Sequence, residues 1–242
     1  MKRRVIRVLL SVAVGAGLLA GGMLLLIRAL GERDVLYQGK SAYYWTEQIK
    51  SQNITASNRA RLVLNQEIIP HLTKTMLEDT NDSKLRLALV EKLNDLPGVN
   101  IFFRPADSRR ADAAVALGEF GPPAEPAVPA LLQAFQGHDL PVRAPAAISL
   151  GKIHSKPEVI VPLLMSYLEV ENLKEAAVQA LGDYGSLSKA AIPKLLLLYK
   201  VPDKDLHHAV EEALKQIDPA AAVEAGVRIP GRPAVAPRTI DR

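Results

Sequence analysis

The stretch RRADAAVALGEFGPPAEPAVPALLQAF (Arg109–Phe135) decides the fold, because its pattern returns twice further along the chain. It holds a Leu-Gly pair with a proline eleven residues after the glycine, and a degraded fourth copy has Lys215 in place of that glycine. A repeat of this period predicts stacked helical units, since one unit alone cannot bury its apolar face. The complete copies are Leu117-Gly118 with Pro129, Leu150-Gly151 with Pro162, and Leu181-Gly182 with Pro193, spaced 33 and 31 residues apart.

Each Leu-Gly pair ends a helical pattern whose apolar residues share one face. Many of them are alanines, which let neighbouring helices approach closely. The residue after the last core position is predicted to end the helix in a left-handed conformation, which Gly, Asp and His tolerate best. The predicted core residues are Ala113, Ala114, Ala116, Leu117 and Phe120, then Ala146, Ala147, Leu150 and Ile153, then Ala177, Val178, Ala180, Leu181 and Tyr184, and the predicted stops are Gly121, His154, Gly185 and Asp218.

A second helix follows in each unit, over residues 127–135, 159–168 and 190–199. Proline fits a helix only in the first turn, so each of these helices is expected to begin about two to five residues before its proline. Two antiparallel helices in each unit predict an all-α solenoid.

The units resemble the HEAT repeat, in particular its phycobilisome-lyase-like variety. The resemblance covers about residues 105–217 well and 57–97 loosely, and it implies a fold while saying little about chemistry. Its residues are Gly118, Phe120, Gly121, Ala127, Val128, Pro129, Ala130 and Leu131 in the first copy, and Asp139, Val142, Arg143, Ala146, Ala147, Leu150, Gly151 and Ile153 in the second.

Residues 1–28 differ from the rest of the chain. Four basic residues precede an apolar stretch of twenty, residues 8–27, which at about 1.5 Å per residue is long enough to cross a bilayer. We expect a retained anchor rather than a cleaved signal peptide, with the N-terminus in the cytoplasm and the array outside it, on a single-pass protein of the inner membrane. Gly17 and Gly21 could pack two anchors together weakly.

The positive net charge of +4 arises in this anchor. Residues 1–28 hold five Lys or Arg and no acid, which leaves 25 basic against 26 acidic residues in the remainder. A near-neutral remainder argues against a nucleic-acid partner. The absence of cysteine excludes disulfides and thiolate nucleophiles.

A lead-in over residues 29–56 separates the anchor from the array, which we place at 57–218 with clear repeats from about 105. The pattern Y-x-G-K-S-x-x-x-W at 37–45 is similar to a segment before HEAT repeats in exported proteins of planctomycete and verrucomicrobial bacteria. Ser41 is expected to cap a short helix whose Tyr44, Trp45 and Ile49 cover the first repeat. Reading Lys40-Ser41 as a phosphate site is disfavoured, because no G-x-x-x-x-G-K motif precedes it.

Three further segments complete the domain plan. Residues 83–96 are expected to form an amphipathic helix with Leu85, Leu89, Leu93 and Leu96 on one face. The segment Ile101–Phe103 lies in a Pro-bounded loop where burial is favoured over exposure to a partner. Residues 219–242 read as a disordered tail.

One cluster has the spacing of metal ligands: His207 and His208 with Glu211 and Glu212, in pairs four residues apart. A third ligand is missing, so we favour a solvated face on which His207 takes the register of Arg110, Arg143 and Lys174. In HEAT families that basic position makes contacts between units, to acids such as Asp139 and Asp203. We predict no catalytic, cofactor or metal site.

Three functions compete for this chain. A membrane-tethered scaffold that binds a protein or peptide is favoured over an enzyme or chromophore-lyase-like subunit with a small-ligand groove, and over a nucleic-acid binder. The binding surface is expected on the second helices, which line the concave side in HEAT arrays. Its candidate residues lie before and between the core leucines: Gln133, Gln136, Ser166, Glu169, Lys194 and Lys200.

Overall fold

The computed structural model describes residues 35–80, 82, 84–101 and 103–227. These residues form helices and loops, with one isolated antiparallel bridge between Tyr37 and Lys40, so the all-α prediction is confirmed for them. Within those ranges no helix is long and apolar enough to span a bilayer. The predicted anchor at 8–27 and the tail beyond residue 227 lie outside the described residues.

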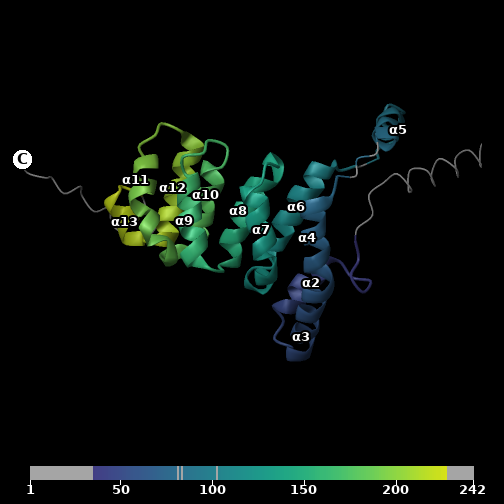
Figure 1. Ribbon diagram of the computed structural model, residues 1–242, viewed down its shortest axis with the longest axis horizontal. Coiled ribbons are helices and arrows are strands. Elements are labelled where there is room, and N and C mark those ends of the chain that lie inside the picture. The colour runs from purple at the N-terminus through teal and green to yellow at the C-terminus, as the bar shows by residue number, and fades with distance from the viewer. Residues whose placement is uncertain (1–34, 81, 83, 102, 228–242) are drawn as a thin grey trace, which may run out of the picture. The chain divides into compact units, whose positions relative to one another are not determined.

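The chain divides into two compact units, which we describe separately (Figure 1). One contains Thr80–Ala106 and the helix α5 (Lys84–Asn94). The other contains Leu36–Asp79 and the chain from Asp107 onward, and it is the solenoid. Its elements are α2 (Ala42–Ile49), α3 (Ile54–Val63), a π-helical turn (Leu64–Ile68), α4 (Ile69–Glu78), α6 (Ala106–Glu119), α7 (Val128–Gln136), α8 (Leu140–Ile153), α9 (Pro157–Tyr167), α10 (Lys174–Asp183), α11 (Ile192–Leu198), α12 (Lys204–Ile217) and α13 (Pro219–Glu224).

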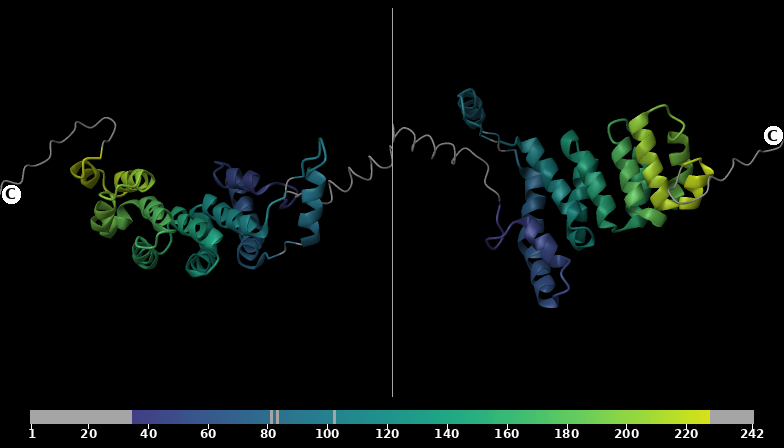
Figure 2. Two further views of the ribbon diagram at one scale, coloured as in Figure 1. Left: turned by 90° about the horizontal axis from the view of Figure 1, so that it is seen from above. Right: turned by 180° about the vertical axis from the view of Figure 1, so that it is seen from behind.

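Helices α6, α8, α10 and α12 are the first helices of successive units, and α8, α10 and α12 lie side by side in both views of Figure 2. Their inward faces carry the predicted core residues. All of these are buried except Ala116, which is half-buried. The repeat pattern therefore identified the stacking face of each first helix correctly.

Gly151 shows why the Leu-Gly pair repeats. A Cβ atom on Gly151 of α8 would lie 2.7 Å from the Cα of Ala180 in α10, closer than atoms of this kind can approach. Gly118 and Gly182 meet Ser149 and Ala213 of the next first helix in the same way. Glycine thus permits the close contact between units, and Lys215 can replace it in α12, where no further unit follows in the described chain.

Each first helix ends at or just before its predicted stop, and the predicted left-handed conformation is confirmed at three of the four stops. Gly121, His154 and Gly185 have φ angles of 62°, 58° and 55°, in the left-handed region. Asp218 differs, since its φ is −154° and its side chain instead caps α13 by accepting from the backbone amides of Ala220 and Ala221. His154 is therefore a helix terminus, as the pattern indicated.

The prolines are placed less uniformly than predicted. Helices α7 and α11 begin one residue before Pro129 and Pro193, each after a 3₁₀ segment, Pro122–Ala127 or Gly185–Ala191. Helix α9 begins at Pro157, five residues before Pro162. The residues directly before these two helices have the tighter 3₁₀ hydrogen-bond pattern, so the α-helix itself begins later than predicted.

In the loosely matching first part of the array, Pro70 takes the place that Pro129 has in the first clear unit, but no break in the helix precedes it. Residues 54–78 are helical without a break, from α3 through the π-helical turn into α4. Proline cannot donate to the carbonyl four residues before it and clashes with that carbonyl. The π-helical turn absorbs the extra width, and in it the amide of Ile69 donates to the carbonyl of Leu64, five residues back.

The predicted array at 57–218 is interrupted by the unit that holds α5. Leu85 and Leu96 are 78% and 44% exposed, so the predicted leucine face is wrong for these two. Leu93 is buried as predicted, together with Val90 and Ile101. Ile101 is held in place by Asn94, whose side-chain oxygen accepts from the Ile101 amide at 2.7 Å. The expected burial is thus confirmed for Ile101, while Phe102 lies outside the described residues.

The predicted disordered tail is wrong for residues 219–227. Helix α13 packs on α12, and Ala222 and Val227 join the main buried cluster. The prediction missed α13 because a helix of 6 residues is too short to show a periodic pattern. Pro219 at the first helical position and Asp218 at the cap are the signals that mark this helix.

The cap of α13 predicts a dependence on pH. The ion pair with Lys189 lowers the pKa of Asp218, and the bonds from the Ala220 and Ala221 amides lower it further. The cap therefore stabilises α13 above the ordinary carboxyl pKa of about 4 and is lost as pH falls below it. NMR chemical shifts of residues 219–224 should move toward coil values in that window. Helical shifts persisting at pH about 2 would contradict this role.

Candidate protein-binding surface

The candidate surface lies on α7, α9 and α11, the second helices of three units. Their buried residues alternate with polar ones: in α7, Leu131, Ala134 and Phe135 face the core. Helical spacing then directs Gln133 and Gln136 away from it, and both are exposed.

The other candidates lie on the following two units. Ser166 on α9 and Glu169 just after it are exposed, as is Lys200 just after α11, while Lys194 on α11 is half-buried. The structure therefore places all six candidates at the molecular surface. Surface position alone does not assign them a role.

Two of the candidates are partners of each other. The Lys194 ammonium lies 3.2 Å from a carboxylate oxygen of Glu169 and also donates to the carbonyl oxygen of Met165, at 3.4 Å. This pair links α11 to the end of α9. Sequence reasoning could not foresee it, because the two residues are 25 positions apart. A substitution at only one would leave the other charge without this partner.

Ser166 is also engaged locally, because its hydroxyl donates to the carbonyl oxygen of Leu163 at 2.7 Å. By contrast, no side-chain hydrogen bond joins Gln133, Gln136 or Lys200 to another residue in the described ranges. These three side chains are thus the ones most available to a partner.

An aromatic contact that the sequence analysis missed lies between α7 and α9. The ring centroids of Phe135 and Tyr167 are 4.4 Å apart, and the Arg143 guanidinium lies 5.6 Å from the Tyr167 ring centroid. Arg143 also donates to the Phe135 carbonyl oxygen at 3.0 Å. Tyr167 is only partly buried. Partly exposed Tyr and Arg side chains contribute much of the binding energy in many protein interfaces. The aromatic residue near the end of each second helix is the sequence signal that could have identified this contact.

The basic position of the first helices makes several kinds of contact. Arg110 pairs with Asp139 of the next unit at 2.6 Å, as the family pattern implied. Asp203 does not take part, because its side chain caps α12. His207, at the same register in α12, instead stacks on the ring of Tyr199 with centroids 3.9 Å apart.

His207 and Glu211, one of the two pairs with the spacing of metal ligands, already have partners in Tyr199 and in each other. Glu211 accepts a hydrogen bond from the Tyr199 hydroxyl at 2.8 Å and lies 3.8 Å from His207 Nδ1. Burial, followed by the Glu211 carboxylate, raises the pKa of Tyr199 to about 12. In the part of the chain that the structure describes, no three His, Cys, Asp or Glu side chains gather as metal ligands would.

The lead-in contains a second feature that the sequence analysis did not connect. The helix cap at Ser41 is confirmed, since its hydroxyl accepts from the Tyr44 amide, and Trp45 is buried. Tyr44 remains 39% exposed, so it does not cover the first repeat as expected. Tyr44 lines a pocket together with residues of α3. The two sets of lining residues come together only because α2 packs on α3.

Two family models match this chain. Residues 128–215 match HEAT repeats, and residues 109–137 match the PBS lyase HEAT-like repeat. Together these ranges run from Arg109 in α6 to Lys215 in α12, the part in which the Leu-Gly register is clearest. No curated protein matches the chain.

Proposed function

This chain is a HEAT-repeat protein with a PBS lyase HEAT-like repeat, and from that premise we propose that it is a membrane-tethered scaffold that binds a protein or peptide. HEAT repeats commonly serve as extended binding surfaces, because stacking leaves one row of helices available along the whole array. We further propose that the row formed by α7, α9 and α11 is the one used, and that the protein acts by binding rather than by catalysis.

The observation that carries the proposal is the regular exposure of polar residues on consecutive second helices. Gln133 and Gln136, Lys200, and the Glu169–Lys194 pair come from three successive units. A peptide lying along the array would meet side chains able to donate and accept hydrogen bonds in each unit. The adjacent Tyr167 and Arg143 would add an anchor that buries apolar area at low entropic cost.

A joint variant tests this surface. Gln133→Ala, Glu169→Gln and Lys194→Gln are made together, so that the ion pair is removed as a whole and no single charge is left. Each change is expected to alter stability by less than about 0.5 kcal/mol. Capture of a partner from the cell envelope in which the protein resides should nonetheless weaken about tenfold or more, if contacts worth at least about 1.4 kcal/mol are lost.

The matched control lies on the first-helix row. Glu175 and Gln179 of α10 are exposed, so Glu175→Gln with Gln179→Ala changes an equal kind of surface elsewhere. The control should capture the partner like the natural protein. Full capture by the joint variant would place binding on another face, and turnover of a defined substrate would overturn the non-catalytic role.

The membrane tether is a proposal from the sequence alone. Its support is the uncharged stretch 8–27 behind four basic residues. We propose a single-pass protein of the inner membrane with the array outside the cytoplasm. An alkaline phosphatase fused after residue 242 should be active. An active cytoplasmic reporter at that point would reverse the topology, and a mature N-terminus beyond Arg28 would reveal a signal peptide.

A further inference from the structure

The lead-in begins the solenoid unit with a tight turn. Tyr37 and Lys40 exchange two backbone hydrogen bonds, of 2.8 and 3.1 Å. The two residues between them, Gln38 and Gly39, have φ angles of 51° and 73°. Glycine adopts this left-handed conformation readily, whereas a residue with a side chain such as Gln38 does so at a cost. Residues held in such conformations concentrate at functional sites.

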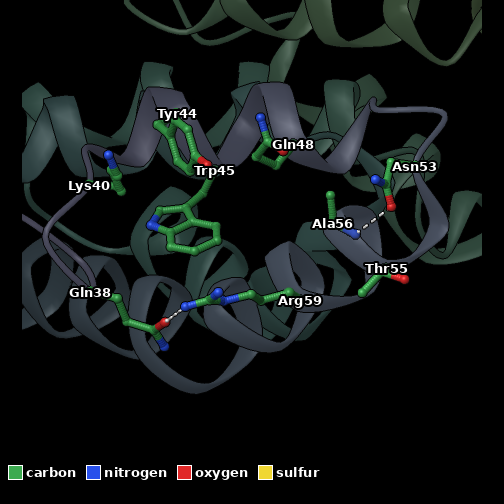
Figure 3. A pocket seen from close by; sticks show the side chains of 9 residues that line it. All are labelled: Gln38, Lys40, Tyr44, Trp45, Gln48, Asn53, Thr55, Ala56 and Arg59. Atoms are coloured by element: carbon green, nitrogen blue, oxygen red, sulfur yellow. Dashed lines mark hydrogen bonds between the residues drawn. The ribbon is translucent and has the colours of Figure 1, made fainter.

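The turn forms one end of a pocket between α2 and α3. The pocket has a volume of about 340 Å³, enough for one or two amino-acid side chains. In Figure 3 the indole of Trp45 extends from α2 toward Arg59 of α3, while Lys40 and Tyr44 lie near one end. Its nine lining residues are Gln38, Lys40, Tyr44, Trp45, Gln48, Asn53, Thr55, Ala56 and Arg59.

The pocket is positively charged. Lys40 and Arg59 line it, and none of the nine lining residues is acidic. Within the described ranges neither cation is paired with a carboxylate; the Arg59 guanidinium donates instead to the side-chain oxygen of Gln38, at 3.2 Å. Gln38 is itself fixed by donating to Glu67 at 2.8 Å. The turn therefore holds the Arg59 guanidinium in position through Gln38, and the other N–H groups of that guanidinium are available to a ligand.

The aromatic groups provide a surface beside these charges. The indole N–H of Trp45 donates to the carbonyl oxygen of Tyr37 at 2.9 Å, so the ring orientation is fixed. The Arg59 guanidinium lies 5.9 Å from that ring, and the Lys40 ammonium lies 5.3 Å from the ring of Tyr44. Each of the two cations therefore lies within cation–π distance of an aromatic ring that borders the pocket.

Amide side chains line the rest of the pocket. Asn53 accepts from the Ala56 amide through its oxygen, at 3.1 Å, which leaves its NH₂ group as a donor. Gln48 of α2 also lines the pocket and offers both a donor and an acceptor. This combination matches a peptide group, which presents one N–H and one C=O. A phosphate dianion presents acceptors only and would use only the donor of Gln48.

We propose that this pocket binds a carboxylate-bearing segment of a peptide. The carboxylate lies at Arg59 and Lys40, with the planar guanidinium donating to its oxygens, and the peptide backbone lies beside Gln48 and Asn53. This site goes beyond the surface proposed for α7, α9 and α11, and it does not depend on that surface.

Trp45 makes the proposal directly measurable, because it is the only tryptophan of the chain. The full-length chain in a non-ionic detergent is titrated with an acetylated and amidated pentapeptide of alternating glycine and glutamate. Its tryptophan fluorescence should change and saturate. The same peptide with glutamine in place of glutamate should bind at least about tenfold more weakly, because the charge-assisted hydrogen bonds are lost.

Two substitutions and a control complete the test. Arg59→Gln and Lys40→Gln should each raise the peptide Kd about tenfold. Arg61→Gln changes an exposed arginine of the same helix outside the pocket and should leave it unchanged. A thermal melt by circular dichroism checks that each variant is folded. Should Arg59→Gln fail to fold, Lys40→Gln, at an exposed turn position, still tests the charge requirement.

Three outcomes would overturn the proposal. They are no saturable response to the acidic peptide, equal binding of its glutamine version, or saturation by inorganic phosphate or glycerol phosphate at lower concentration than by the peptide. The last outcome would assign the pocket to a phosphate or a lipid headgroup. Because the readout is at Trp45, its failure is distinguishable from failure of capture by the α7, α9 and α11 surface.

Discussion

Replacing Phe135 with alanine is expected to lower the free energy of unfolding of the solenoid by about 3–5 kcal/mol. The Phe135 side chain is 0% exposed and its ring packs against Tyr167 of the next unit. Its removal leaves a cavity between α7 and α9, and the two helices cannot close it without moving the units. Urea denaturation of residues 35–242, followed by circular dichroism, measures the change.

The control for this substitution is another apolar residue of a second helix. Leu197 of α11 is 66% exposed, so Leu197→Ala should change stability by no more than about 0.5 kcal/mol. Similar effects of the two substitutions would mean that α7 and α9 are not packed as described.

Replacing Gly151 with leucine is expected to cost about 3 kcal/mol, the upper part of the range for overpacking a core. The first side-chain carbon already meets backbone atoms of Ala180 in α10, at 2.7 and 3.0 Å. Backbone cannot rotate away as a side chain can, so α8 and α10 must separate. Leucine favours a helix over glycine by somewhat under 1 kcal/mol, which offsets only part of this.

The leucine at position 151 is compared with one at an exposed position of the neighbouring helix. Gln179→Leu on α10 adds the same side chain where solvent can accommodate it, and it should leave the urea midpoint nearly unchanged. If Gly151→Leu were as stable as Gln179→Leu, the close contact between first helices would be disproved.

The repeated units could be predicted from sequence because their determinants are local. The spacing of Leu150, Ile153 and the alanines before them fixes one helical face, and His154 fixes where that helix ends. Each unit then repeats the same solution. The alanines of that face were expected to let neighbouring helices approach closely, whereas the contact of Gly151 with Ala180 is seen only in the packing of α8 on α10.

The parts that could not be predicted depend on contacts distant in sequence or on short elements. Pro70 looks like a helix start, but the π-helical turn before it lets one helix continue. Leu85 fits an apolar face by spacing, yet the small unit of residues 80–106 buries Val90 and Ile101 instead. Helix α13 is too short to produce a periodic pattern.

The candidate surface was predictable only as a row of positions. Spacing identified which side chains face outward, including Gln133 and Lys200. The pairing of Glu169 with Lys194, and the joining of Arg59 to the turn at Gln38, depend on how helices pack and could not be inferred from spacing. These two contacts are set by packing, so they become visible only in the folded chain.

Site-specific photocrosslinking tests the central claim most directly. A photoreactive amino acid is placed at Gln133, Ser166 or Lys200 on the second-helix row, and at Gln179 on the first-helix row as control. The account predicts an adduct of one defined mass from all three second-helix positions in the native cell envelope, and none from position 179. An adduct from position 179 alone, or none from any second-helix position, would contradict binding along α7, α9 and α11.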